Sequence, residues 1–200
     1  IRCALHFSNP WELLVATILS AQCTDKRVNS ITEYLFKKYP RIEDYAHAPL
    51  HQFENDIRSA GFFRAKAKNI ISAAHIICEH FNGKVPGSMD ALCSLPGVAR
   101  KTANVVLYNA FHRLDGIAVD THVRRLSQRL GLSHHEDPEK IEQDLMCSIP
   151  KPLWGHSTYW LIEHGRTICA AKKPQCTECF LKLLCPFGKH AGRSGQQKNR

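Results

Sequence analysis

The sequence predicts an all-α protein. Apolar residues recur at intervals of three and four along nearly the whole chain, and no stretch alternates between apolar and polar residues as a half-buried strand would. The chain has 200 residues, of which 44% are apolar and 22% are charged, close to the averages of globular domains. It is long enough for one ordinary domain or two small ones. No apolar run approaches the roughly 20 residues that a membrane span needs.

Four helices are expected in the first 83 residues of the chain. The first begins at Pro10, because Ser8 and Asn9 are good cap residues and proline favours the first helical position. The others end before Pro40, at Gly61 and at the Asn82-Gly83 pair. The apolar residues that mark the four helices are, in order, Trp11, Leu14, Val15, Ile18 and Leu19; Val28, Ile31 and Leu35; Leu50, Phe53 and Ile57; and Ile70, Ile71, Ala74, Ile77, Cys78 and Phe81.

The second half of the chain continues the same pattern. Helices are expected around residues 89–94, over residues 100–111, before Gly131, after Asp137-Pro138 and through Trp160 to Gly165. We predict a domain of six helices over residues 10–113 and a second domain formed by residues 1–9 and 114–188. Residues 189–200 are polar and basic, and are expected to form a flexible tail.

The positive charge is concentrated near the C-terminus. The chain holds 27 Lys and Arg against 18 Asp and Glu, a net charge of +9. Residues 146–200 alone contain 9 Lys and Arg but only two acidic residues, Glu163 and Glu178. A basic lobe beside a nearly neutral one favours a polyanionic partner, and nucleic acid is favoured over a membrane because no long basic amphipathic helix accompanies it. A solvated surface that keeps the protein in solution is the alternative.

A Pro-Gly turn joins two expected helices in the segment Leu95-Pro96-Gly97-Val98-Ala99-Arg100-Lys101-Thr102. Gly97 can take the positive φ that such a turn needs. The amide groups at the start of the next helix would then be available to a phosphate. Arg100 and Lys101 stand where the helix dipole disfavours cations, which gives the turn a functional interpretation beyond that of a connector.

Lys101 and Asp120 are the candidate catalytic pair. Most helical lysines are solvated surface residues, but a neutral lysine amine is also a nucleophile, and a helix N-terminus supplies positive potential. Asp120 follows Ile117-Ala118-Val119 and stands where a helix N-cap belongs. A carboxylate can also stabilise positive charge that develops on a reacting carbon, and the two roles are compatible.

Nine cysteines, an odd number, argue against a disulfide scaffold, and four of them lie within 17 residues. The four are Cys169, Cys176, Cys179 and Cys185, in the spacing C-x6-C-x2-C-x5-C. Such a set can ligate one tetrahedral zinc ion or one iron–sulfur cluster, and the ligand types alone do not distinguish the two.

Several of these motifs, together with further segments, resemble those of one protein family. The hairpin sequence LPGVARKTANVV followed by IAVDTH resembles the endonuclease III family of DNA base-excision glycosylases. Leu19-Ser20-Ala21-Gln22-Cys23-Thr24-Asp25 resembles that family's LSAQ-x-TD turn, and His164-Gly165-Arg166 precedes the cysteines as in the family. The matching segments span residues 9–186, and the cysteine spacing is the one that endonuclease III relatives use for one 4Fe–4S cluster.

The resemblance implies a role for individual residues. Lys101 would attack the sugar C1′ and form a Schiff base, and Asp120 would assist cleavage of the glycosidic bond. Gln22 would fill the gap left by the flipped base, and Phe62 would be an apolar wedge, unless it is a core residue beside Phe63. The residues expected to contact DNA are Gln22, Phe62, Gly97, Ala99, Arg100, Thr102, Arg166, Lys172 and Lys173. Ala99 replaces a glycine of the family's turn, and we expect crowding at the phosphate or strain of about 1 kcal/mol if φ is positive there.

The sequence as a whole therefore predicts two helical domains flanking a DNA-binding cleft. The expected activity is that of a bifunctional DNA glycosylase and AP lyase that removes oxidised pyrimidines from duplex DNA. A monofunctional, adenine-excising glycosylase and a non-catalytic DNA-binding module with a four-cysteine metal site are the alternatives. We expect a monomer with no membrane association, in the cytoplasm or nucleoid of a bacterium, or in the nucleus or mitochondrion of a eukaryote.

Overall fold

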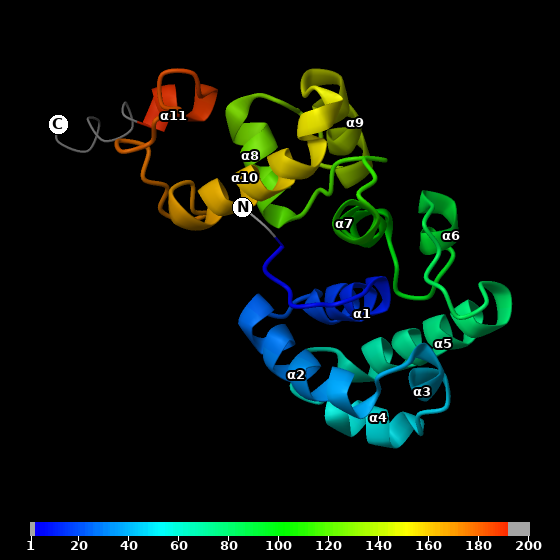
Figure 1. Cartoon of the computed structure of the whole chain (residues 1–200). Helices are drawn as coiled ribbons and strands as arrows, with labels where there is room; N and C mark the ends of the chain where they lie inside the picture. The colour runs from blue at the N-terminus through cyan, green and yellow to red at the C-terminus, as the bar shows by residue number, and fades with distance from the viewer. Residues whose placement is uncertain (1–2, 192–200) are drawn as a thin grey trace. The chain divides into compact units, whose positions relative to one another are not determined.

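The computed structural model describes residues 3–191, which form helices and no strand, and this confirms the predicted all-α class (Figure 1). Contacts between Cα atoms divide the chain into two compact units with a boundary between Asp115 and Gly116. The N-terminal unit contains α1 to α7, and the C-terminal unit contains α8 to α11 and the 3-10 helix η1. No helix within residues 3–191 is both long enough and apolar enough to cross a membrane.

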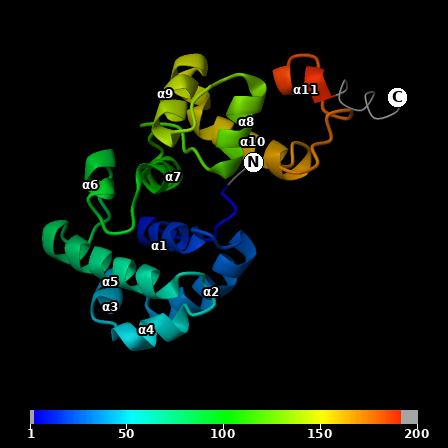
Figure 2. The ribbon, with the colours of Figure 1, turned by 180° about the vertical axis from the view of Figure 1, so that it is seen from behind.

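Helix α1 (Pro10–Ser20) lies at the centre of the N-terminal unit. Its first turn is capped by the Asn9 side chain, which accepts a hydrogen bond from the Glu12 amide at 2.9 Å, and Pro10 occupies the first helical position as predicted. From Leu13 to Leu19 every residue is buried, because the helix has neighbours on all sides. Both views of the ribbon place α1 between α7 and α5 (Figures 1 and 2).

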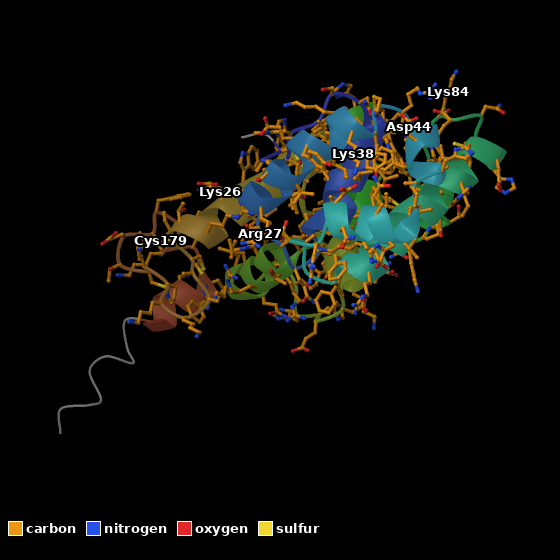
Figure 3. All side chains as sticks on the ribbon, turned by 90° about the horizontal axis from the view of Figure 1, so that it is seen from below. Lys26, Arg27, Lys38, Asp44, Lys84 and Cys179 are labelled. Carbon is orange, nitrogen blue, oxygen red and sulfur yellow. The ribbon has the colours of Figure 1, made fainter. Side chains whose placement is uncertain are left out.

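Helices α2 and α7 pack against α1, α3 and α4 pack against α5, and α6 packs against α7. Their core includes an aromatic cluster in which Phe53 lies 5.5 Å from Tyr39 and 5.7 Å from Tyr45, measured between ring centroids. Lys38 forms an ion pair with Asp56 at 2.7 Å at the edge of this cluster (Figure 3). The helices are α2 (Asp25–Lys38), α3 (Ile42–Ala46), α4 (Leu50–Asp56), α5 (Phe63–His80), α6 (Met89–Cys93) and α7 (Arg100–Phe111).

The assignment of the N-terminal segment differs from the expectation. Residues 1–9 are predicted to belong with the C-terminal domain, but the described part of this segment belongs to the N-terminal unit. The Asn29 side chain of α2 explains the difference, because its Oδ1 accepts from the His6 amide at 3.0 Å and its Nδ2 donates to the Ala4 carbonyl at 2.9 Å. These two hydrogen bonds attach the segment to α2.

The C-terminal unit has a smaller core. Five residues form it, and partly buried apolar residues of α9 and α10 pack against them; the five are Ile117, Val119, Val123, Ile141 and Leu145. Gly131, with φ +74°, ends α8 in the left-handed conformation that suits glycine. The elements are α8 (Thr121–Leu130), α9 (Pro138–Ser148), η1 (Lys151–Leu153), α10 (Trp154–Thr167) and α11 (Pro186–Ala191).

Three short elements were not predicted, namely α3, η1 and α11. Each has six residues or fewer, so the helical period repeats too few times to be visible in the sequence. α11 includes residues 189–191 of the predicted flexible tail. The remainder of that tail, residues 192–200, lies outside the described residues.

Candidate active site and cysteine centre

The Pro-Gly turn between α6 and α7 requires glycine for two reasons. Gly97 has φ +78°, in the left-handed region. A Cβ atom at Gly97 would also lie 2.8 Å from Nδ2 and 2.9 Å from Cβ of Asn69, a residue of α5. The turn is closed by the Val98 amide, which donates to the Leu95 carbonyl at 3.1 Å. Helix α5 therefore supports the hairpin directly beneath its tightest point.

Ala99 is the N-cap residue of α7 and is extended, with φ −91° and ψ 169°. The expected positive-φ strain at Ala99 is therefore absent, because this backbone conformation is open to any residue. An alanine side chain has no oxygen with which to cap the helix, and no side chain caps α7. The first hydrogen bond of the helix runs from the Ala103 amide to the Ala99 carbonyl at 3.0 Å.

The candidate residues around this turn differ in exposure. Gly97, Ala99 and Lys101 are exposed, and Arg100 is partly exposed. Thr102 is buried, with 9% of its surface exposed, which departs from its expected role as a DNA contact because its side chain faces the core. Only the backbone of Thr102 remains for such a contact. Lys101 thus extends from the first turn of α7 on the same exposed surface as the glycine turn.

Gln22 and Phe62 occupy two exposed turns of the N-terminal unit that approach each other. Both have left-handed backbones, with φ +53° at Gln22 and +57° at Phe62. The Gln22 carbonyl oxygen would lie 3.5 Å from a Cβ atom at Gly61, the residue before Phe62. Phe62 is 68% exposed, which excludes the alternative that it is a core aromatic.

Asp120 is the N-cap of α8, as predicted. Its Oδ1 accepts hydrogen bonds from the amides of His122 and Val123, both at 2.8 Å. Its Oδ2 accepts no hydrogen bond from the described residues, and the side chain is partly exposed. Capping therefore uses one carboxylate oxygen and leaves the other available. Asp120 belongs to the C-terminal unit, whereas Lys101 belongs to the N-terminal unit.

The four predicted cysteine ligands line one cavity of the C-terminal unit, together with Arg129, His164 and residues of the connecting loop. All four are free thiols, and Cys179 lies in the loop between α10 and α11 (Figure 3). Burial raises the pKa of the Cys176 thiol, and the three neighbouring thiols raise it further, whereas the Arg129 guanidinium lowers it. Within residues 3–191 no three His, Cys, Asp or Glu side chains are arranged to hold a single metal ion.

Nitrogen atoms lie within hydrogen-bond distance of three of the four sulfurs. Arg129 Nη1 lies 3.2 Å from Cys169 Sγ, the Gly188 amide lies 3.3 Å from Cys185 Sγ, and His164 Nε2 lies 3.4 Å from Cys179 Sγ. Such contacts stabilise thiolates that ligate iron or zinc. The predicted DNA contacts Arg166, Lys172 and Lys173 are exposed on the same segment of chain.

Two functional candidates were missed by the sequence analysis. Arg129 also donates to the carbonyls of Ala170 and Ala171, both at 2.9 Å, so it holds the start of the cysteine loop. Lys66 on α5 is 5% exposed, and its ammonium group contacts the end of α1. Both are basic residues on amphipathic helices, and nothing in their sequence context separates them from exposed neighbours.

Comparisons with known proteins agree with this arrangement. A family model described as HhH-GPD superfamily base excision DNA repair protein matches residues 15–151. Endonuclease III of Synechocystis sp. is 56% identical over 184 residues, 92% of this chain and 84% of the relative. Endonuclease III of Bacillus subtilis is 48% identical over 197 residues, 98% of this chain and 90% of the relative.

A solved structure of a trapped endonuclease III–DNA covalent intermediate has a TM-score of 0.91 and 47% identity, and the match covers 96% of this chain and 90% of that chain. The family match exceeds half of the chain, and the curated relatives are similar over most of their length. The chain therefore belongs to the HhH-GPD superfamily of base excision DNA repair proteins and, within it, to the endonuclease III family of DNA glycosylases.

Proposed function

We propose that this DNA glycosylase is bifunctional: it removes oxidised pyrimidines from duplex DNA and then cleaves the strand as an AP lyase, through a Schiff base on Lys101. The observation that carries the proposal is the exposed Lys101 amine in the first turn of α7, directly after the Gly97 turn. A related endonuclease III has been trapped as a covalent intermediate with DNA, which supports a nucleophilic residue in the family.

The reaction assigned to Lys101 is an attack of its neutral amine on the sugar C1′. The C1′–N bond to the damaged base breaks, and the base leaves with its bonding electrons and a proton. The C1′–O4′ bond of the sugar ring then opens, O4′ takes up a proton, and a protonated imine forms between C1′ and the lysine nitrogen. The imine makes the C2′ proton acidic, so loss of that proton expels the 3′ phosphate by β-elimination.

Asp120 supplies the negative charge that this step needs. Positive charge develops at C1′ as the base leaves, and a carboxylate placed near it lowers the energy of that transition state. The Oδ1 contacts with the amides of α8 fix the orientation of the carboxyl group, which leaves Oδ2 for the reacting sugar. Capping and catalysis are then two uses of one side chain.

Gln22 and Phe62 are proposed to act on the DNA helix itself. A base inside the duplex must leave the stack before its C1′ can be attacked, and the space it leaves favours an inserted side chain. Two exposed side chains on adjacent turns, one polar and one aromatic, suit these tasks. An aromatic wedge can part adjacent base pairs, and an amide can bond the unpaired partner base.

The phosphate contacts are proposed to come from both units. The amides that begin α7 and the Arg100 side chain serve one phosphate, and the turn at Gly97 and Ala99 permits close approach. Arg166, Lys172 and Lys173 add exposed positive charge beside the cysteine cavity. Contacts of this kind position the DNA without reading its sequence.

We propose that Cys169, Cys176, Cys179 and Cys185 ligate one 4Fe–4S cluster. Four free thiols that line one cavity, with nitrogen contacts to three of the sulfurs, are a donor set that fits such a group. When bound, the cluster would fix the loop between α10 and α11 rather than take part in the base chemistry. Visible absorption with iron and sulfide by elemental analysis supports the cluster, whereas a colourless protein that contains zinc contradicts it.

Borohydride trapping tests the lyase proposal. An imine between lysine and abasic-site DNA is reduced by borohydride to a stable amine, which leaves the protein covalently attached to DNA. We expect the wild-type protein to form this adduct and Lys101→Ala to form none, with Lys68→Ala as the control at an exposed lysine of α5. Base release without an adduct would indicate the monofunctional alternative, and DNA binding without either activity would indicate the non-catalytic one. We further propose that the protein acts as a monomer, in the cytoplasm or nucleoid of a bacterium or in the nucleus or mitochondrion of a eukaryote.

A further inference from the structure

Lys66 is a buried cation that the proposed chemistry does not use. It lies on the second turn of α5 and is 5% exposed, whereas Lys68 on the same helix is exposed. Fully buried lysines are rare unless their charge is compensated. Burial lowers the pKa of the Lys66 ammonium group. The presence of a lysine at this buried position therefore needs an explanation.

The ammonium group of Lys66 is bonded to the last carbonyls of α1. Its Nζ donates to the Leu19 carbonyl at 2.8 Å and to the Ala21 carbonyl at 2.7 Å. The carbonyl between them, on Ser20, accepts from the Cys23 amide at 3.1 Å. The end of a helix leaves its carbonyls without partners inside the helix and has negative potential, so a cation is stabilising there.

The carbonyls bonded by Lys66 lie just before the residue proposed to enter the DNA. Ala21 immediately precedes Gln22, whose left-handed backbone is costly for a residue other than glycine. The Lys66 hydrogen bonds hold the chain that leads into this strained residue. Among the described residues, these carbonyls accept no other side-chain or turn hydrogen bond.

The backbone of the same lysine is bonded to the second strained residue. The Lys66 amide donates to the Phe62 carbonyl at 3.1 Å, which forms the first turn of α5. One residue thus contacts the backbone beside Gln22 through its side chain and the backbone of Phe62 through its amide. Three residues further along α5, Asn69 lies against Gly97 of the hairpin.

We propose that Lys66 is a positioning residue, which holds the Gln22 turn in the geometry that fills the gap in the duplex, in register with the Phe62 wedge. This inference rests on the proposed roles of Gln22 and Phe62. On this proposal, the start of α5 keeps the Gln22 and Phe62 side chains rigid before DNA binds. A turn that is already ordered loses less entropy on insertion, so the base-flipped state forms more readily.

The test compares single-turnover base release from duplex DNA containing thymine glycol, an oxidised pyrimidine. Lys66→Met keeps the apolar stem and removes the donor group, and Lys68→Met is the matched control on the same helix. We expect Lys66→Met to lower the rate on the order of tenfold, because small misplacements of positioning groups have effects up to roughly 100-fold. Lys68→Met is expected to match the wild type, and Lys66→Arg, which keeps a cationic donor, to recover most of the rate.

Two readouts separate positioning from a general structural effect. In a double-mutant cycle, Lys66→Met is expected to add little to Gln22→Ala, because the lysine acts through that residue. On single-stranded abasic DNA there is no gap to fill, so borohydride trapping by Lys66→Met is expected to equal that of the wild type. Additive losses in the cycle, an equal loss on single-stranded DNA, or a wild-type rate on the duplex would each overturn the proposal.

The controls also distinguish the failure of this inference from that of the proposed function. Absence of trapping by the wild type would refute the lyase proposal, and a wild-type rate for Gln22→Ala would refute the gap-filling role. An impaired Gln22→Ala beside an unimpaired Lys66→Met would refute only the role of Lys66. If Lys66→Met is unfolded at the assay temperature, Lys66→Gln takes its place in both readouts, with the same outcomes deciding.

Discussion

Replacing Gly97 by alanine tests the hairpin geometry, because two separate terms oppose a Cβ atom there. The left-handed backbone, with φ +78°, costs about 1–2 kcal/mol for an alanine. The Cβ atom would also lie 2.8–2.9 Å from Asn69, including the Asn69 Cβ, which is fixed to α5 and cannot rotate away. Overpacking of this kind costs typically about 1–3 kcal/mol. We expect Gly97→Ala to lose about 2–5 kcal/mol of unfolding free energy in total.

Gly83 provides a matched control in the same unit. It has φ +69°, but the nearest atom to an added Cβ is Oε1 of the Glu43 side chain at 3.2 Å, the far end of a flexible group. Gly83→Ala is therefore expected to lose only the backbone term, about 1–2 kcal/mol. Urea unfolding of both variants and the wild type, with the slope m compared among them, measures the difference. Equal losses for the two alanine variants would refute the inference that Asn69 closes the hairpin from below.

Three further predictions address the core, the catalytic carboxylate and the cysteine loop. Phe53→Ala, at a fully buried ring between two tyrosines, is expected to lose about 3–5 kcal/mol in urea unfolding; a loss below about 1 kcal/mol would contradict the packing described. Asp120→Asn keeps an N-cap acceptor but removes the negative charge. The melting temperature of this variant should therefore stay near that of the wild type, while its rate of base release falls by about 100-fold or more. An unchanged rate would show that Asp120 only caps α8. Arg129→Met removes the hydrogen-bond donor to Cys169 Sγ and to the Ala170 and Ala171 carbonyls. We expect this variant to retain the cluster about 10–100-fold less well in the presence of a chelator, as measured by visible absorption. Retention equal to that of Lys173→Met, a variant at an exposed site, would contradict this.

Much of the fold was predictable because local signals and tertiary packing agree. The cap at Asn9, the proline at position 10 and the apolar face of α1 all indicate one helix start, and the structure confirms it. The C-terminus of α8 at Gly131 and that of α5 after His80 were also predictable, because glycine and asparagine residues form left-handed turns there. In α3 and α11, of five and six residues, the helical period repeats too few times to be recognised, and both were missed, although α6, also of five residues, was expected.

The site was predictable only in part. The sequence placed Lys101 and Asp120 at helix N-termini, where the structure has them, and it grouped the four cysteines that share one cavity. Their chemical roles came from the family resemblance and remain predictions. Thr102 was expected to contact DNA, but its side chain is buried, because the helical period carries it to the inner side of α7.

Lys66 illustrates what a single sequence cannot contain. Lysine is ordinarily an exposed residue, and Lys66 becomes buried only because the end of α1, 45 residues earlier in the chain, lies over it with two carbonyls to bond. Likewise, the Asn29 side chain draws residues 3–9 to α2, a contact between segments that no local pattern marks.

The most direct test of the proposed mechanism is to locate the covalent bond that DNA forms with the protein. After borohydride trapping on abasic-site DNA, the adduct is digested and the modified peptide is sequenced by mass spectrometry. We expect the reduced sugar remnant on the Nζ atom of Lys101, in the first turn of α7. A remnant on any other lysine, or no adduct from an active protein, would contradict the claim that Lys101 is the nucleophile.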